Sequence, residues 1–198
     1  MPASAEQSFA TTKAFADTLP VGWFSDFDIG AYRSLIRELP DGATIVEVGV
    51  WEGRSMCSIA DLILQKGITA IAVDTFLGVV LQSHAYGDAP AERAQARFER
   101  NVGIFGLSPI VYRMTSAQAA ATIDRPIDLT MIDADHEYAS VYQDIRLWAP
   151  KTSRILCGHD YDAYTGAHPG VKRAVDEAFP HMQSISYIWF VKGDAHGR

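Results

Sequence analysis

Residues 44–55 read TIVEVGVWEGRS, an apolar run of strand length followed by a turn with two glycines, Gly49 and Gly53. Glycine lets the backbone turn tightly and approach a ligand closely, and a helix is expected to open at about Arg54. A dinucleotide fingerprint would need glycines two and five residues after Gly49, where this chain has Trp51 and Arg54. A strand, a glycine turn and a helix in this order predict the first unit of an α/β fold.

Apolar runs of strand length alternate with helix-like segments almost to the end of the chain. The expected strands are 44–49, 69–74, 110–113, 127–133, 154–158 and 186–191, and the expected helices lie near 54–66, 90–102, 115–122, 138–148 and 170–178. Continuous apolar strands are typical of a parallel sheet that is covered on both faces. The sequence therefore predicts an α/β fold: a doubly wound, mostly parallel sheet with helices on both faces.

The pattern changes at about residue 43, which divides the chain into two expected parts. Residues 1–42 form an N-terminal helical segment, in which apolar residues recur at helical spacing over 29–39 before Pro40 and Gly42 stop the helix. Residues 43–198 form the main domain. The long connection 75–89 is a candidate lid, because connections of this length in compact domains are usually functional or disordered.

The composition limits the kinds of molecule that the protein is expected to bind. The 198 residues include 17 basic and 24 acidic side chains, a net charge of −7, which argues against a general binder of nucleic acid. No uncharged apolar stretch reaches the ~18 residues of a membrane span, and the first residues do not resemble a secretory signal. We expect a cytoplasmic protein whose partner is a small molecule, and neither nucleic acid nor a membrane. The sequence leaves open whether the protein forms a homo-oligomer.

Polar side chains follow several of the expected strands, and ligands in open α/β sheets bind beyond the carboxyl ends of the strands. Asp74 stands 25 residues after Gly49 and could bind the hydroxyls of a ribose, although it could also cap a helix. Asp133 and Asp160 follow two further strands and could hold a hard cation such as Mg²⁺. His136 beside them could accept a proton at physiological pH. The alternative is a helix-capping acid and a hydrogen-bonded histidine at a strand end.

Four stretches, in this order after the 44–55 turn, carry a resemblance to a known family. They read VDTF at 73–76, IDLTMIDADHEY at 127–138, GHDY at 158–161 and PGVKRAVD at 169–176. They look like small bacterial class I S-adenosylmethionine-dependent methyltransferases, a family related to macrocin O-methyltransferase and cephalosporin hydroxylase-type proteins. The resemblance covers about residues 43–192 and implies a Rossmann-like fold.

The resemblance also implies a set of residues that contact S-adenosylmethionine. These are Glu47, Gly49, Val50, Trp51, Gly53, Ser55, Asp74, Thr75, Ser116, Ala117 and Asp133. Metal-dependent relatives carry a pair of oxygen ligands after the fifth strand, where this chain has an imidazole followed by Asp160. The implied metal ligands are therefore Asp133 and Asp160, with Mg²⁺ as the candidate ion. His136 matches the histidine proposed as the general base in macrolide-modifying relatives.

The expected reaction is O-methylation of a small-molecule or sugar hydroxyl, with His136 as catalytic base and a cation on Asp133 and Asp160. A non-catalytic protein that binds adenosylmethionine is one alternative. An NAD-dependent oxidoreductase is another, although the glycine spacing speaks against it. Candidate residues for the acceptor pocket are Trp23, Phe24, Phe27, His84 and Tyr86, of which the first two could simply pack on the core.

Overall fold

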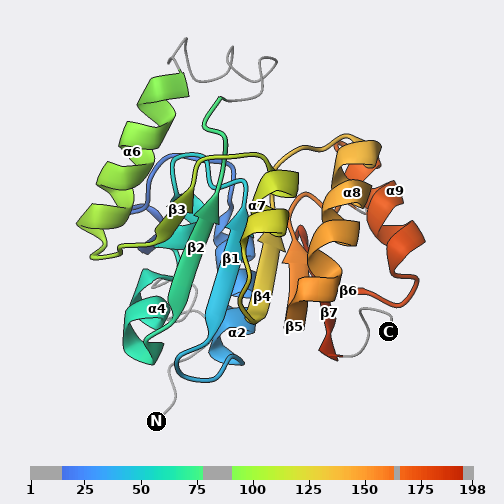
Figure 1. Ribbon diagram of the computed structural model, residues 1–198, viewed down its shortest axis with the longest axis horizontal. Helices are drawn as coiled ribbons and strands as arrows, with labels where there is room; N and C mark the ends of the chain where they lie inside the picture. Colours follow the sequence, from blue (N-terminus) through green and yellow to red (C-terminus); the bar gives the residue numbers. More distant parts are fainter. Residues whose placement is uncertain (1–14, 78–90, 163–165, 194–198) are drawn as a thin grey trace.

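A computed structural model describes residues 15–77, 91–162 and 166–193 of the chain. Its strands form one sheet in the order β3-β2-β1-β4-β5-β7-β6 (Figure 1). Their bounds are β1 Thr44–Val48, β2 Thr69–Val73, β3 Ile110–Tyr112, β4 Ile127–Ile132, β5 Thr152–Gly158, β6 Gln183–Ile185 and β7 Ile188–Lys192. Strands β1 to β5 are parallel, with Val46 of β1 opposite Ile71 of β2 and Thr130 of β4, whereas β7 runs antiparallel to β5 and β6. The predicted doubly wound, mostly parallel sheet is confirmed.

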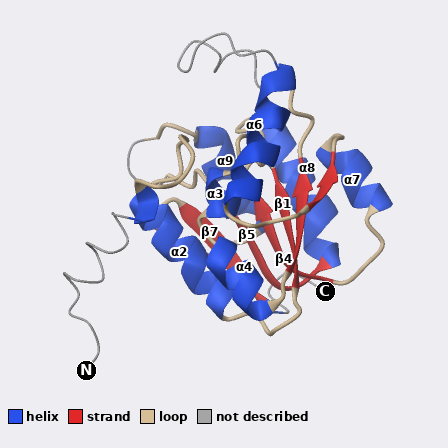
Figure 2. Ribbon diagram, turned by 90° about the vertical axis from the view of Figure 1, so that its left-hand side faces the viewer, coloured by secondary structure: helices blue, strands red, loops and turns tan. Residues whose placement is uncertain are grey.

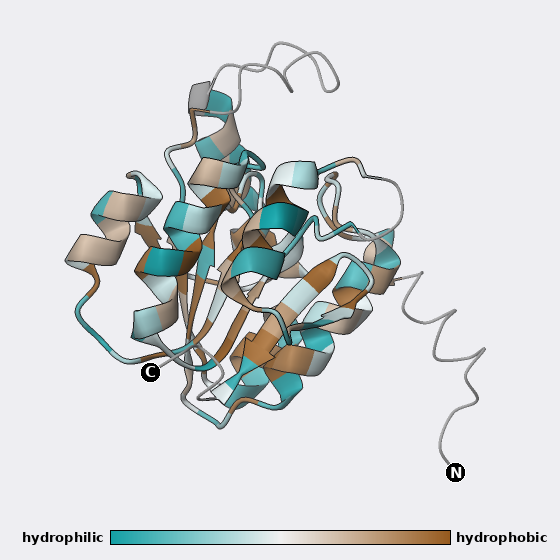
Figure 3. Ribbon diagram, turned by 90° about the vertical axis from the view of Figure 1, so that its right-hand side faces the viewer, coloured by the Kyte–Doolittle hydropathy of each residue, from teal (hydrophilic) through white to brown (hydrophobic). Residues whose placement is uncertain are grey.

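Helices cover both faces of this sheet, as Figure 2 shows. They are α2 Asp26–Arg37, α3 Arg54–Cys57, α4 Ala60–Lys66, α6 Ala91–Ile104, α7 Ser116–Thr122, α8 Tyr138–Trp148 and α9 Pro169–Ala178, with a short 3-10 turn at Ala149–Lys151. Apolar residues of α2, α3, α4 and α6 share one buried core, and those of α7, α8 and α9 share the other. Hydrophobic residues accordingly concentrate along the strands, between the more polar helices (Figure 3).

Two expected elements differ from those in the structure. The segment 54–66 is two helices, because the Ser58 hydroxyl donates to the carbonyl of Ser55 and the Ser58 carbonyl accepts from Arg33, which ends α3. The last expected strand, 186–191, is the second half of a hairpin. β6 precedes it, and Ser186 lies in the turn with a φ of 55°. Because β6 has three residues and all are exposed, the sequence contains no buried apolar run that would predict it.

The N-terminal segment packs against the sheet. Ser25 and Asp28 form a capping box, which starts α2 three residues before the expected helix. Ile29, Leu35 and Ile36 then lie in the same buried core as residues of β1 and β7. In the three described ranges, no helix has both the length and the apolar character needed to cross a membrane.

A carboxyl group is buried at the centre of the sheet. Glu47 of β1 is fully buried, accepts a hydrogen bond from the Ser55 hydroxyl, and lies near the buried Tyr32 of α2. Burial raises the pKa of Glu47 to about 8, because an ionised carboxylate loses its hydration there. Glu47 therefore enters the folded state as a neutral acid at neutral pH.

We expect this acid to make stability fall as the pH rises. Its pKa is raised on folding, so unfolding releases a proton between about pH 4.5 and 8, and the free energy of unfolding drops with pH across that window by about 1 kcal/mol per pH unit. Glu47→Gln keeps the shape and removes the proton. Urea unfolding of both proteins from pH 5 to 8 measures the difference, and parallel profiles would show that Glu47 titrates normally.

A second prediction concerns Gly158, where β5 passes closely between its neighbours. An added Cβ would lie 2.6 Å from the Ile132 carbonyl oxygen and 2.6 Å from Nε1 of Trp189. Gly158→Ala should therefore lower the free energy of unfolding by about 1–3 kcal/mol. Gly30 is the matched control, because it lies exposed in α2 with no atom within 4 Å of an added Cβ. Gly30→Ala should raise stability by about 0.5–1 kcal/mol in the same unfolding experiment.

Candidate functional site

A cavity of about 680 Å³ opens at the carboxyl ends of β1, β2, β4 and β5. This volume lies within the range of small-molecule sites, and the position is the usual one for ligands in open α/β sheets. Its walls come from the segment before α2, the β1–α3 turn, the end of β2, the start of α7 and the segments after β4 and β5. The lining residues are Gly22, Trp23, Phe24, Val48, Gly49, Val50, Trp51, Arg54, Ser55, Val73, Asp74, Thr75, Met114, Ser116, Asp133, Ala134, Asp135, His136, His159, Asp160 and His168.

The β1–α3 turn depends on Gly49. Its φ of 86° lies in the left-handed region, and an added Cβ would come within 2.1 Å of the Asp133 carbonyl oxygen. Only glycine fits this position, because any Cβ would meet the backbone of the segment after β4. The close approach brings the glycine turn and Asp133 to the same wall of the cavity.

Asp74 fixes the shape of that turn. One carboxylate oxygen accepts hydrogen bonds from the backbone N–H groups of Val50 and Trp51, both at 2.9 Å, and the other accepts one from Phe76 at 2.7 Å. Trp51 and Phe76 have φ values of 45° and 55°, which non-glycine residues rarely adopt. The carboxylate holds both segments in these conformations, so the turn is preorganised without a ligand.

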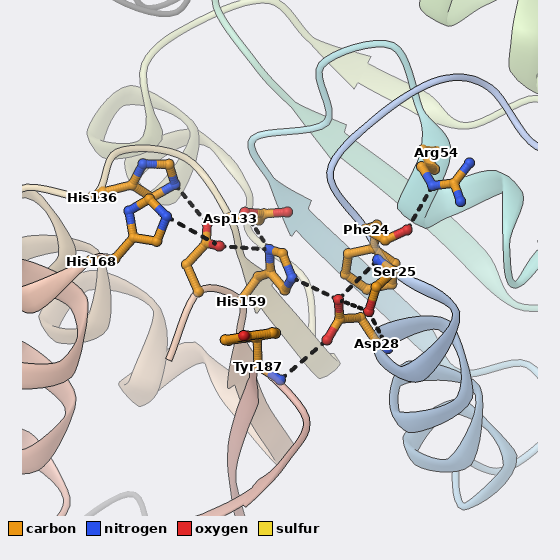
Figure 4. Close-up of polar contacts among 10 residues, drawn as sticks. Phe24, Ser25, Asp28, Arg54, Asp133, His136, His159, His168 and Tyr187 are labelled. Atoms are coloured by element: carbon orange, nitrogen blue, oxygen red, sulfur yellow. Dashed lines mark hydrogen bonds and ion pairs between the residues drawn. The ribbon is translucent and has the colours of Figure 1, made fainter. Parts of the chain in front are cut away.

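His159 is buried between carboxylates from three elements (Figure 4). Its Nε2 lies 3.3 Å from Oδ2 of Asp28 on α2, and its Nδ1 lies 3.5 Å from Oδ1 of Asp133 and 3.4 Å from Oδ1 of Asp160. Burial lowers the pKa of His159, but the charge of Asp133 and the hydrogen bonds that the imidazole donates to the three acids raise it well above 6.5. The ring of Phe24 packs on the imidazole at a centroid distance of 4.9 Å. His159 is therefore an imidazolium, with a carboxylate at each nitrogen.

The charge of His159 also acts on its partners. Burial raises the pKa of Asp28, but the hydrogen bond and charge of His159 lower it to about 2. The pKa of Asp160 is held far below its usual range by hydrogen bonds from His136 and His159, which outweigh its burial. Both acids stay ionised at every pH at which the protein would work.

His136 and His168 approach Asp160 from the cavity side (Figure 4). Nε2 of His136 lies 2.7 Å from Oδ2 of Asp160, and Nε2 of His168 lies 3.7 Å from Oδ1. The hydrogen bond to Asp160 raises the pKa of His136 above 6.5, against the effect of burial. Asp160 has a φ of 59°, a strained conformation that is held by these surroundings.

Most of the residues expected from the sequence lie on the cavity wall. They are Gly49, Val50, Trp51, Ser55, Asp74, Thr75, Ser116, Asp133, His136 and Asp160, together with Trp23 and Phe24. Glu47, Gly53, Ala117 and Phe27 do not line it: Glu47 is buried under the turn, Gly53 packs on Phe98, and Phe27 is exposed. His84 and Tyr86 lie outside the described residues.

Sequence reasoning missed three residues of the site. Asp28 reaches His159 from α2, His168 lies beside His136, and Arg54 donates to the carbonyls of Phe24 and Pro20, both at 2.7 Å. Arg54 thereby ties the segment before α2 over the glycine turn. The capping box at Ser25 signals a helix start, but nothing in the sequence says that its acid also meets a histidine 131 residues later.

Comparison with known proteins bears on the family and on the fold. The profile of a family described as a methyltransferase domain matches residues 46–161. No curated protein sequence matches the chain. Among solved structures, the O-methyltransferase NovP has a TM-score of 0.59 and 19% identity, with 88% of this chain and 84% of that chain covered.

Two further solved structures have similar folds. An S-adenosylmethionine-dependent O-methyltransferase from Thermotoga maritima has a TM-score of 0.63 and 10% identity, over 92% of this chain and 70% of that chain. An rRNA methylase from Streptococcus thermophilus has a TM-score of 0.59 and 12% identity, over 83% and 94%. At these identities the likeness shows the fold and leaves the substrate open.

The match to the methyltransferase profile contains the glycine turn, Asp74 and the segments after β4 and β5, which together form most of the cavity. It spans more than half of the chain. The chain therefore belongs to this methyltransferase family, and its fold is that of the class I S-adenosylmethionine-dependent methyltransferases.

Proposed function

We propose that the protein binds S-adenosylmethionine in this cavity and methylates a hydroxyl group of a small-molecule or sugar acceptor, with His136 as the base. The observation that carries the proposal is that one cavity joins a preorganised glycine turn to a histidine–carboxylate pair. The first is suited to holding the methyl donor, and the second to accepting the proton of the hydroxyl.

The turn and Asp74 fit the methyl donor. Gly49 opens the backbone toward the cavity, and Asp74 stands at its wall with three backbone N–H bonds. A carboxylate has about four lone-pair sites, so Asp74 keeps capacity for a ribose hydroxyl. Ser116 lies across the cavity at the start of α7, where the adenine ring would reach. Bound S-adenosylmethionine would supply a methyl group activated by a positively charged sulfur.

The His136–Asp160 pair fits the base. Because Nε2 faces the carboxylate at 2.7 Å, it carries the ring proton and donates to Asp160, which leaves the lone pair on Nδ1. Nδ1 can then take the proton of an acceptor hydroxyl while the oxygen attacks the methyl carbon. Asp160 orients the ring and stabilises the imidazolium that forms, as an ionised acid does in a catalytic triad.

The residues after β4 and β5 do not fit the expected Mg²⁺ ion. Asp133 and Asp160 face each other across His159, whose Nδ1 lies within 3.5 Å of both. Mg²⁺ prefers oxygen ligands in octahedral geometry, and an imidazolium between the two carboxylates occupies that place with its own positive charge. His159 takes the role of a cation here, so no step of the proposed reaction uses Mg²⁺.

The charge around the cavity supports a small acceptor that carries no phosphate. Asp133, Asp135 and Asp160 line the half that contains His136. Arg54, the arginine on the described part of the lining, already donates to two backbone carbonyls, and His159 is already paired with carboxylates. Together with a net charge of −7, this favours a neutral acceptor over nucleic acid.

Calorimetric titration tests the proposed donor site. We expect S-adenosylmethionine and S-adenosylhomocysteine to bind the wild-type protein, and NAD not to bind. Asp74→Ala removes two hydrogen bonds from the turn and one from Phe76, and each bond to a charged group is worth about 1.5–3 kcal/mol. Because the turn then loses its preorganised shape, affinity should fall by at least about tenfold. Asp124→Ala is the matched control, because Asp124 is exposed and does not line the cavity. Equal affinity of the two variants would contradict the proposed donor site.

A kinetic experiment on an acceptor found by screening tests the base. His136→Ala should lower kcat by about 10²–10⁴-fold, the usual contribution of a general base, and leave the dissociation constant of S-adenosylmethionine unchanged. Added imidazole should restore part of the turnover, which a merely structural role would not allow. His181→Asn, a substitution of an exposed histidine, should behave as wild type. Equal losses in turnover and donor binding, without rescue, would refute the base.

A further inference from the structure

Two imidazoles and one carboxylate meet on the cavity wall, from three separate segments of the chain. His136 follows β4, Asp160 follows β5 and His168 immediately precedes α9. We propose that these three side chains bind a divalent transition metal ion of the Zn²⁺ class, at a site that shares Asp160 with the expected Asp133–Asp160 pair but uses two histidines in place of Asp133.

The distances between the donor atoms suit a single ion. One ligand atom from each of the three residues can be chosen so that all lie within 4.8 Å of one another. Nε2 of His136 is 2.7 Å from one oxygen of Asp160, and Nε2 of His168 is 3.7 Å from the other. Bonds of about 2.0–2.1 Å place neighbouring ligands of one ion roughly 3–3.4 Å apart, between these two distances. Binding thus requires side-chain adjustments that bring the three ligand atoms, which lie within 4.8 Å of one another, to that spacing.

The donor set selects the kind of metal. Imidazole nitrogens suit zinc, iron, nickel and copper, whereas magnesium and calcium prefer oxygen ligands. Catalytic metal sites that keep an open position commonly have three protein ligands. Two histidines and one carboxylate supply that number. The three side chains line the cavity and are 27%, 19% and 33% exposed, so water or another ligand can reach an ion there.

The surroundings hold the ligands in place. Nδ1 of His159 lies 3.4 Å from Oδ1 of Asp160. It fixes that carboxylate from the buried side, as outer-shell partners of metal ligands do. On the other side, Gly170 lets α9 approach closely, because an added Cβ would lie 2.3 Å from the carbonyl oxygen of His136. This packing brings His168 beside His136, with ring centroids 4.4 Å apart.

Metal binding has a consequence that rests on the proposed function. An ion on Nε2 of His136 replaces the proton there, and the neutral ring then carries its proton on Nδ1. Nδ1 can no longer accept the proton of a hydroxyl. The metal-bound form is therefore inactive, and the ion acts as an inhibitor that competes with the base.

Metal titration of the whole protein tests the site without a methyl donor or acceptor. After removal of metals with a chelator, Zn²⁺ should bind at one ion per chain in calorimetry, and Co²⁺ should produce a visible ligand-field band. His168→Asn should weaken Zn²⁺ binding by about 10–100-fold or more, since loss of even an outer-shell partner costs that much. Mg²⁺ should bind far more weakly than Zn²⁺.

Two control variants make the test specific. Asp133→Asn should keep Zn²⁺ affinity, because Asp133 belongs to the neighbouring group with His159, and His181→Asn should keep it because His181 is exposed and does not line the cavity. Circular dichroism confirms that each variant is folded. Absence of stoichiometric Zn²⁺ binding, equal affinity in His168→Asn, or binding lost in Asp133→Asn would each overturn the site. Zn²⁺ binding without any binding of S-adenosylmethionine would instead overturn the proposed function alone.

Discussion

A buried imidazolium holds the carboxyl edge of this sheet together. His159 is 6% exposed, and its two nitrogens face acids from α2 and from the segments after β4 and β5. A charge that is removed from water is tolerated only when it is paired, and removal of one partner leaves the others uncompensated. Asp28 therefore makes α2 part of the site. The segment before α2 belongs to the site as well, because Phe24 packs on the His159 ring. The N-terminal helix thus takes part in the cavity as well as in the core.

The side of the cavity that contains the glycine turn depends on a different constraint. Gly49 allows the β1–α3 turn to touch the backbone of the segment after β4, and the Asp74 carboxylate accepts hydrogen bonds from two N–H groups of that turn and from Phe76 after β2. Two rarely populated backbone conformations, at Trp51 and Phe76, persist because these contacts determine them. Asp74 accordingly has a structural task in addition to the ribose contact that its position suggests. The hydrogen bonds and the strained backbone of the turn are present without a ligand. The free-energy cost of ordering the turn on ligand binding is therefore lower.

The sequence predicted the parallel part of the fold because each buried strand is a continuous apolar run that a helix follows. It also predicted which strand ends meet, since parallel strands place their carboxyl ends at one edge. The hairpin of β6 and β7 was missed because β6 is short and exposed. Glu47 was expected at the ligand, but the strand's alternation points it into the core instead. Asp28 and His168 reach the site through helix packing, a tertiary contact that no local pattern contains.

The side of the cavity that contains His136 is organised around one carboxylate. Asp160 faces His159 on its buried side and His136 and His168 on the cavity side. The acids around His159 raise its pKa well above its usual value despite its burial, which favours the charged form beside Asp160. His136 and His168 are partly exposed on the cavity wall and lack that constraint. The difference between the buried histidine and the two cavity-facing histidines here follows from burial and the number of acidic neighbours, because the side chains themselves are chemically the same.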